Sequence, residues 1–278
     1  KMLAMVNGKI NEDQYCFSSP EFEEALSVAI KKYTIENGSH RKFMIMPNDN
    51  YIVCQCKKCI AAGNTKSNAS PAVFTLLNKL AVKFPDQQFF STAYNTTLSP
   101  PQFKVAPNAG VMISSMPFPK GVIIEDSNKR DLVEKTLKEW KKITGTIYLW
   151  DYAINFDNYF DPYPTVSIAQ RNFQFYKKHG ITGIFINGNE ESYAAFDDLK
   201  SYLYAKPLSD PNVNIESHIR LFFNSNYPNV SELLSDYYLK IEKLSLGSRN
   251  QLDIYGGLKQ AKNKLSMITE AVMLTSAI

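Results

Sequence analysis

Short apolar segments alternate with helix-like segments through the first two hundred residues, and this alternation limits the folds open to the chain. The apolar segments show no alternation of polar and apolar residues, which is typical of strands covered on both faces by helices. Such strands belong to a parallel sheet. We therefore predict an α/β fold with five strands, at residues 43–46, 89–94, 111–114, 146–150 and 183–186.

The segments between these strands carry helix signals. Ser19-Pro20-Glu21 supplies a cap, a proline at the first helical position and an acid in the first turn, and Gly38 ends that helix. After about residue 195 no further strand is evident. We expect a partial α/β domain over residues 1–210 and an all-helical extension over residues 211–278, with helices at 196–205, 215–226, 230–246 and 250–275.

Composition excludes several functional classes. The chain has 278 residues, of which 44% are hydrophobic and 21% charged, as in an ordinary globular protein. The net charge of +4 comes from lysines spread along the chain, so no basic stripe indicates nucleic-acid binding. No apolar run approaches the roughly 20 residues of a membrane-spanning helix. Residues 1–6 are too short for a signal peptide, so the protein is either cytoplasmic or has lost a leader.

Polar and aromatic residues follow four of the predicted strands. Because ligands of parallel α/β proteins bind beyond the carboxyl ends of the strands, these residues predict a polar cleft. Nucleotide fingerprints and the G-x-S-x-G motif are missing from the sequence, which argues against Rossmann, P-loop and serine-hydrolase chemistry. The four segments are Asn48-Asp49-Asn50, Tyr94-Asn95, Trp150-Asp151-Tyr152 and Asn187-Gly188-Asn189.

Asp151 and Asp49 are the carboxylates of this predicted cleft. Asp151 leaves its strand between Trp150 and Tyr152, an arrangement suited to a sugar site in which a ring stacks on the pyranose and the carboxylate meets a hydroxyl. The alternative is that Asp151 caps the following turn. Asp49 has a similar alternative, because it can form an Asx turn that organises the loop after its strand.

Four cysteines form the second notable pattern. Cys54, Cys56 and Cys59 lie within six residues, and Cys16 precedes the first helix. Four thiolates complete a tetrahedral zinc site, and a closed site of this kind is structural because it leaves no position for substrate. Two disulfides or four free thiols are the alternatives. In each case the cysteines stabilise the loop that carries Asp49, and we expect no cofactor for catalysis.

These motifs together resemble a known family, the bacterial domain of unknown function 4838. It is grouped with glycoside-hydrolase TIM barrels and is frequent in polysaccharide-degrading Bacteroidetes. The resemblance covers residues 3–240 and departs from the family at Ile186-Asn187 and at Tyr193-Ala194-Ala195. The segments that carry it are Asn48-Asp49-Asn50 with the following cysteines, Leu149-Trp150-Asp151-Tyr152 with Asn155-Phe156, Gly183-Ile184-Phe185 with Gly188-Asn189, Tyr15-Cys16-Phe17 and Tyr202-Leu203-Tyr204-Ala205-Lys206.

The resemblance implies a (β/α)8 TIM-barrel-like fold, of which this chain holds the last five βα units. It also implies a carbohydrate partner, an exported full-length protein located in the periplasm or on the cell surface, and a missing N-terminal half.

We expect a glycoside hydrolase in which Asp49 donates the proton and Asp151 acts as base or orients the substrate. The expected substrate-binding residues are Asn48, Tyr94, Trp150, Tyr152, Asn155, Asn187 and Asn189.

Two other functions remain open. A non-catalytic carbohydrate-binding module could use the same scaffold, and the departures from the family on the last strand favour it. A zinc-stabilised scaffold without a ligand is the third. Substitution of the carboxylates separates the first two, because catalysis would vanish while binding survives.

Overall fold

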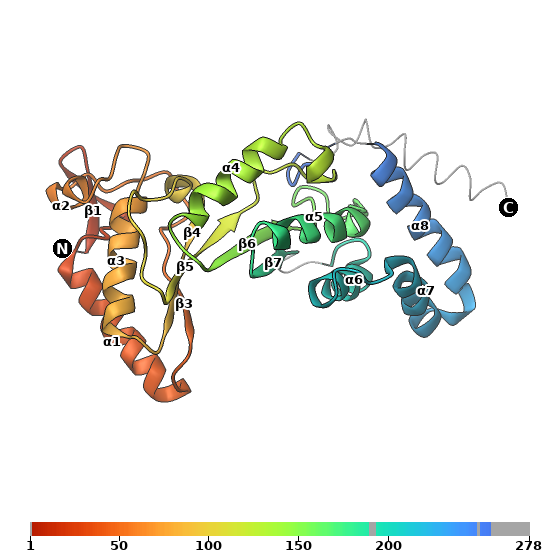
Figure 1. The fold of residues 1–278 in the computed structure, drawn as a ribbon, viewed down its shortest axis with the longest axis horizontal. Coiled ribbons are helices and arrows are strands. Elements are labelled where there is room, and N and C mark those ends of the chain that lie inside the picture. Colours follow the sequence, from red (N-terminus) through yellow and green to blue (C-terminus); the bar gives the residue numbers. More distant parts are fainter. Residues whose placement is uncertain (1, 189–192, 249–250, 257–278) are drawn as a thin grey trace. The chain divides into compact units, whose positions relative to one another are not determined.

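The computed structural model describes residues 2–188, 193–248 and 251–256 (Figure 1). The chain divides into two compact units. Unit 1 contains residues 1–114, 135–150 and 180–183, and unit 2 contains residues 115–134, 151–179 and 184–278. Each unit is treated separately below.

Unit 1 holds an antiparallel hairpin and most of a parallel sheet. The hairpin pairs β1 (Leu3–Val6) with β2 (Lys9–Tyr15). Its turn, Asn7-Gly8, has positive φ at both residues, as a two-residue hairpin turn requires. The remaining elements of the unit are α1 (Pro20–Asn37), β3 (Lys42–Met44), α2 (Lys57–Ala61), α3 (Ser70–Lys83), β4 (Gln88–Ala93), β5 (Ala109–Ser114), the C-terminal part of α4 (Arg130–Lys141) and most of β6 (Ile147–Tyr152).

The sheet confirms the predicted α/β class. Its strand order, β3-β4-β5-β6-β7, follows the chain, as in consecutive units of a TIM-like barrel. The pairs β3–β4, β4–β5 and β5–β6 are parallel, with Phe89 opposite Ala109 and Ser114 opposite Trp150. The order is consistent with a partial barrel of five βα units.

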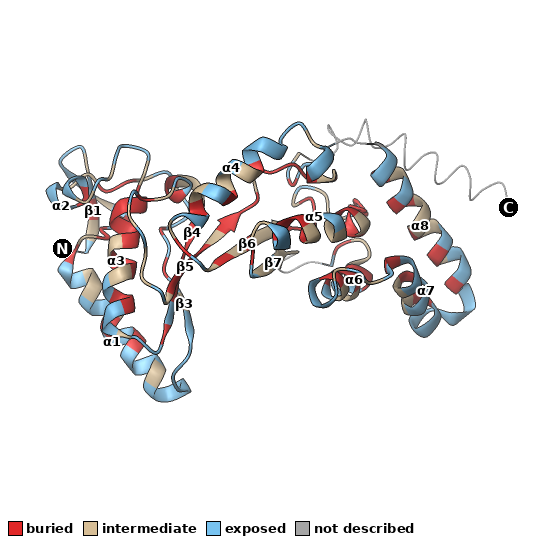
Figure 2. Ribbon diagram, viewed as in Figure 1, coloured by how far each residue is buried: buried red, intermediate tan, exposed pale blue. Residues whose placement is uncertain are grey.

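The core of unit 1 lies between the sheet and its helices. Figure 2 shows α3 and the central strands largely buried and α1 largely exposed. Phe74 of α3 packs on Trp140 of α4 with ring centroids 5.3 Å apart, and both side chains are fully buried. Gly110 in β5 is required by close packing, because a Cβ atom there would lie 2.6 Å from the Phe90 ring and 2.6 Å from the Thr146 carbonyl oxygen.

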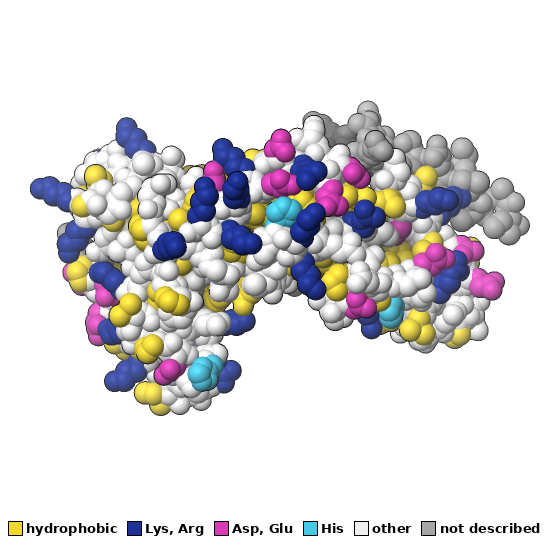
Figure 3. All heavy atoms as spheres, in the orientation of Figure 1, with side chains coloured by type: hydrophobic (Ala, Val, Ile, Leu, Met, Phe, Trp, Pro, Cys, Tyr) yellow, Lys and Arg dark blue, Asp and Glu magenta, His cyan; other side chains and the backbone are white. Residues whose placement is uncertain are grey.

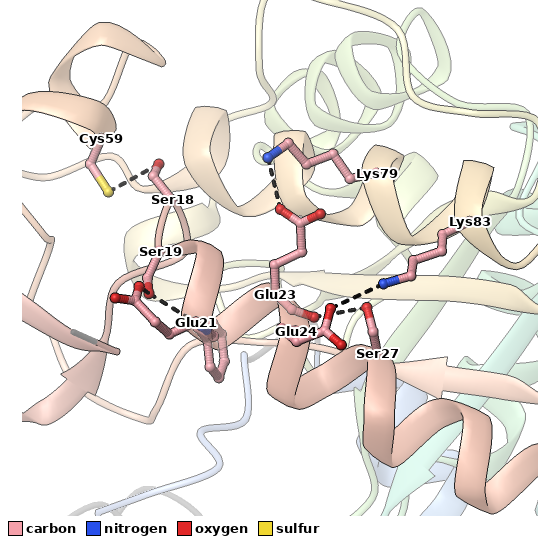
Figure 4. Close-up of polar contacts among 10 residues, drawn as sticks. Ser18, Ser19, Glu21, Glu23, Glu24, Ser27, Cys59, Lys79 and Lys83 are labelled. Carbon is pink, nitrogen blue, oxygen red and sulfur yellow. Dashed lines mark hydrogen bonds and ion pairs between the residues drawn. The ribbon is translucent and has the colours of Figure 1, made fainter.

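Figure 4 shows polar contacts between the N-terminal part of α1 and its neighbours. The Ser19 hydroxyl accepts from the Phe22 N–H and caps the helix, as its sequence predicts. Glu23 pairs with Lys79 at 2.8 Å and Glu24 with Lys83 at 3.3 Å. These pairs are exposed, so each contributes little to stability. Figure 3 shows Lys and Arg side chains scattered over the visible face of the chain.

Unit 2 is built mainly from helices. It contains α5 (Val166–Lys178), most of β7 (Gly183–Asn187), α6 (Asp197–Ser209), α7 (Ile215–Asn226) and α8 (Ser231–Ser248). Glu242 of α8 is buried, and its two carboxylate oxygens accept from the N–H groups of Val166 and Ser167 at the start of α5. No helix among the described residues is long and apolar enough to cross a membrane.

Most predicted elements are present, with three differences. The hairpin β1–β2 and the short helix α2 were not expected. Strand β6 extends through Asp151 to Tyr152, so Asp151 lies at the end of the strand rather than beyond it. The helix expected at 250–275 lies almost wholly outside the described residues.

Candidate functional site

The four cysteines come together in unit 1. Their sulfur atoms all lie within 4.8 Å of one another, and Cys16 Sγ lies 3.7 Å from the sulfurs of both Cys56 and Cys59. All four are free thiols in the structure. A zinc ion with Zn–S bonds of about 2.3 Å separates its tetrahedral ligands by about 3.8 Å. The cluster therefore has the residue types and the spacing of a metal site.

Backbone hydrogen bonds help to position these sulfur atoms. The Cys56 side chain accepts from the Cys59 N–H at the start of α2, and Cys54 Sγ accepts from the Met5 N–H of the hairpin. Hydrogen bonds from the Cys16 and Cys59 thiols lower the pKa of the Cys54 thiol. The hydrogen bond with Cys54 raises the pKa of Cys16, and hydrogen bonds with Cys16 and then Cys54 raise the pKa of Cys59. The cluster thus favours thiolate at Cys54, the form that binds metals.

The same hairpin holds the loop that carries Asp49. The Asn48 and Asn50 side-chain amides both donate to the Asp13 carbonyl oxygen, at 2.8 and 2.9 Å. The Gln14 amide donates to Asn50 Oδ1. Asn48 was predicted to bind substrate, but its side-chain amide donates a hydrogen bond within the protein, to Asp13.

Asp49 lies beside the next strand end. Its side chain is exposed, and Oδ1 accepts from the Asn95 amide at 2.9 Å. Asn95 has a left-handed backbone with φ 46°, a conformation that asparagine tolerates better than most residues. The neighbouring Tyr94 ring lies 5.7 Å from the Trp150 ring, and both side chains are half-buried. These four residues form a cluster, here called the Asp49 cluster.

Asp151 lies in unit 2 with a different set of partners. Its Oδ1 accepts from the Ser115 hydroxyl at 2.5 Å and from the Tyr152 N–H at 3.0 Å. Lys120 Nζ lies 3.4 Å from the same oxygen. The Asp151 side chain is 16% exposed and the Lys120 side chain 9%, so this is a largely buried ion pair.

A cavity of about 20 Å³ adjoins Asp151, which is enough for one water molecule. Its walls include four tyrosines, Tyr152, Tyr163, Tyr176 and Tyr204. Tyr163 has φ 45°, a strained backbone for a bulky residue and one that is frequent at functional sites. Burial raises the pKa values of Tyr163, Tyr176 and Tyr204. The walls are formed by Lys120, Asp151, Tyr152, Tyr163, Thr165, Asn172, Tyr176, Tyr204 and neighbouring apolar residues.

The other predicted substrate-binding residues have varied environments. Tyr152 is buried, with its ring 6.1 Å from that of Phe156. Asn155 is buried, and its side chain accepts from the Asp157 N–H. Asn187 is half-buried at the end of β7 and its carbonyl accepts from the Ala153 N–H. Asn189 lies outside the described residues.

Sequence analysis missed Ser115 and Lys120. Ser115 directly follows β5, the one strand end among β3–β7 for which no site residue was predicted. It could have been found by extending the strand-end argument to every strand. Lys120 had no comparable signal, because its position depends on the fold of the following loop.

Fold and site together define a class: an α/β protein with a five-stranded parallel sheet of consecutive βα units and a four-cysteine cluster beside it. The chain belongs to the family described as domain of unknown function (DUF4838), whose model matches residues 1–238. A comparison with curated proteins found no match.

Proposed function

We propose that the chain is a glycan-active protein that hydrolyses glycosidic bonds. The Asp49 cluster is the observation that supports this most directly. The half-buried rings of Tyr94 and Trp150 offer an apolar face to a pyranose, and the adjoining Asn95–Asp49 pair offers donors and acceptors to its hydroxyls.

In the proposed reaction Asp151 is the base. A water oxygen bonds to the anomeric carbon, the glycosidic C–O bond breaks, and Asp151 takes the proton of the water. The leaving oxygen takes a proton from a general acid, for which Asp49 is the sequence-based prediction. Asp49 and Asp151 belong to different units, so their joint action remains a prediction.

A non-catalytic glycan-binding module is the second candidate. The exposure of the Asp49 side chain favours it, because general acids usually lie in apolar surroundings that keep them protonated. Under this alternative the Asp49 cluster binds glycans without reaction.

Release of reducing ends from a panel of polysaccharides tests the proposal. We expect release by the wild type and its loss in Asp151→Asn and Asp49→Asn. Asp86→Asn is the matched control, because Asp86 is exposed just before β4, at the opposite end of that strand from Asn95. Release that persists in Asp151→Asn would contradict the proposed base.

Calorimetric binding of the same glycans separates the two candidates. A wild type that binds but releases no reducing ends would establish the binding module. Trp150→Ala should weaken binding about tenfold, or about 1.4 kcal/mol, because the stacking surface is lost. Unchanged binding in Trp150→Ala would contradict the role of the Asp49 cluster.

We also propose that Cys16, Cys54, Cys56 and Cys59 bind a structural zinc ion. Support comes from sulfur separations near those of a tetrahedral site and much longer than a disulfide bond. Elemental analysis of the purified protein should find one zinc per chain, and Cys59→Ser should lose it. An intact mass four hydrogens lighter, without bound metal, would instead establish two disulfides.

Two further expectations from the family resemblance belong to this proposal. We expect the full-length protein to be exported to the periplasm or cell surface and to carry further barrel strands. A longer reading frame with a leader peptide would support both, and cell fractionation of the full-length protein would test its location.

A further inference from the structure

Lys120 is a buried cation with an unusually complete set of acceptors. Its Nζ donates to the Ser115 carbonyl oxygen, to Ser115 Oγ at 2.9 Å and to the Phe118 carbonyl oxygen at 3.4 Å. Burial lowers the pKa of Lys120, and the nearby Asp151 opposes this effect. Since a buried charge is costly unless paired, the Asp151 carboxylate is an important partner for this ammonium group.

Ser115 connects the two charges. Its hydroxyl has a single proton, which it donates to Asp151 Oδ1, while its oxygen accepts from Lys120. Ser115 is fully buried, so its hydroxyl is not an accessible nucleophile. Its hydrogen bonds instead fix the position of Asp151 Oδ1 relative to Lys120.

The contacts on Asp151 are one-sided. Ser115, Lys120 and the Tyr152 N–H all act on Oδ1. No described residue donates to Oδ2, although Asp151 adjoins the cavity. Oδ2 therefore retains its capacity to accept a proton or a hydrogen bond.

The other titratable side chains that line the cavity beside Asp151 supply no second cation. They are Tyr152, Tyr163, Tyr176 and Tyr204, and burial raises the pKa values of the last three. Asp161 and Asp253, which act on Tyr163, are acids. Lys129 acts on Lys120 as a like charge. Lys120 is therefore the cation that pairs with Asp151 within unit 2.

We infer that Lys120 and Ser115 are positioning residues that hold Asp151 as an oriented carboxylate with Oδ2 presented to the ligand. This inference deepens the proposed function and rests on it. It gives Asp151 the role of base, because its Oδ1 is held by two donors and a nearby ammonium group while Oδ2 stays open to accept a proton. Neither residue touches the substrate in this arrangement.

The test uses Ser115→Ala and Lys120→Met in the full chain, with exposed Lys138→Met on α4 as the matched control. Ser115→Ala should lower kcat by roughly tenfold or more and change KM little, because Asp151 loses its orientation while the substrate contacts remain. Lys120→Met should likewise lower kcat more than it changes KM, because Asp151 loses the ion pair that holds its Oδ1. A merely structural role would reduce the folded fraction and leave kcat per folded molecule unchanged.

A second readout does not require activity. The 13C carboxyl resonance of Asp151, identified by its absence in Asp151→Asn, should change its chemical shift at fixed pH in both Ser115→Ala and Lys120→Met, because each variant removes a contact of Oδ1. If this shift occurs but the wild type releases no sugar, the positioning inference stands and the proposed function fails. If the resonance and kcat are unchanged in both variants, the positioning inference is wrong. Ser115→Ala, which removes only a hydroxyl, decides the question should Lys120→Met not fold.

Discussion

Glu242 in α8 accepts hydrogen bonds from the N–H groups of Val166 and Ser167, which lie 76 and 75 residues earlier in the chain. The carboxylate thus serves as the N-terminal cap of α5, where Thr165 makes no side-chain cap bond. Helix N-termini favour negative charge, but burial opposes it here and raises the pKa of Glu242.

Glu242→Gln tests this arrangement. A folded-state pKa above the unfolded value contributes stability that is complete at low pH and is lost as pH rises through the folded value. Glutamine keeps one acceptor and does not titrate, so the variant should be less stable by about 1–2 kcal/mol at acidic pH. The difference in the free energy of unfolding between the variant and the wild type should narrow as pH rises. Urea unfolding between pH 4 and 7 measures it, and a difference that grows with pH would contradict the role of burial.

Gly110→Ala tests the packing of β5. The new Cβ would overlap the Phe90 ring and the Thr146 carbonyl oxygen, and the backbone oxygen cannot move without disturbing the sheet. We expect a loss of about 1–3 kcal/mol in the free energy of unfolding. Gly145→Ala is the control, since a Cβ there meets nothing within 4 Å. Equal stability of the two variants would contradict the packing described for β5.

Removal of metal by a chelator tests the connection between the cysteines and the Asp49 loop. Because Cys54 contacts the hairpin at Met5, and Asn48 and Asn50 contact it at Asp13, loss of the ion should loosen both segments. Hydrogen exchange should rise in residues 2–16 and 48–59 and stay unchanged in α7, which belongs to unit 2. Protection that is the same with and without chelator would contradict a structural metal.

Asn95 provides two separable tests. Asn95→Gly keeps the left-handed backbone and removes the hydrogen bond to Asp49, whereas Asn95→Ala also adds backbone strain of about 1 kcal/mol. We expect thermal unfolding to show Asn95→Ala as the less stable variant, and both variants to bind glycan more weakly. Weakened binding only in Asn95→Ala would indicate that the backbone, rather than the amide, matters.

Much of the fold was predictable from local patterns. The start of α1 at Pro20, the whole of α7 and the five strands follow from caps, periodicity and apolar runs. The hairpin was missed although Asn7-Gly8 is a strong hairpin turn signal, because the strands beside it are short and mostly exposed.

The candidate site was predictable only in part. The cysteine cluster was predictable from the sequence because three of its members are close together in the chain. The Asn95–Asp49 pair was not predicted, although the strand-end argument places both residues at the same edge. Lys120 could not be found, since its burial against Ser115 and Asp151 depends on tertiary packing that no local pattern encodes.

The one-sided contacts of Asp151 limit which ligands it can bind. A calcium ion often takes both oxygens of a carboxylate, and here one of them already accepts from a hydroxyl and a backbone N–H and is paired with an ammonium group 3.4 Å away. Bidentate chelation of a hard cation would have to displace these donors. Asp151 is therefore suited to a ligand that approaches a single oxygen with a single proton, such as a water molecule or a hydroxyl group.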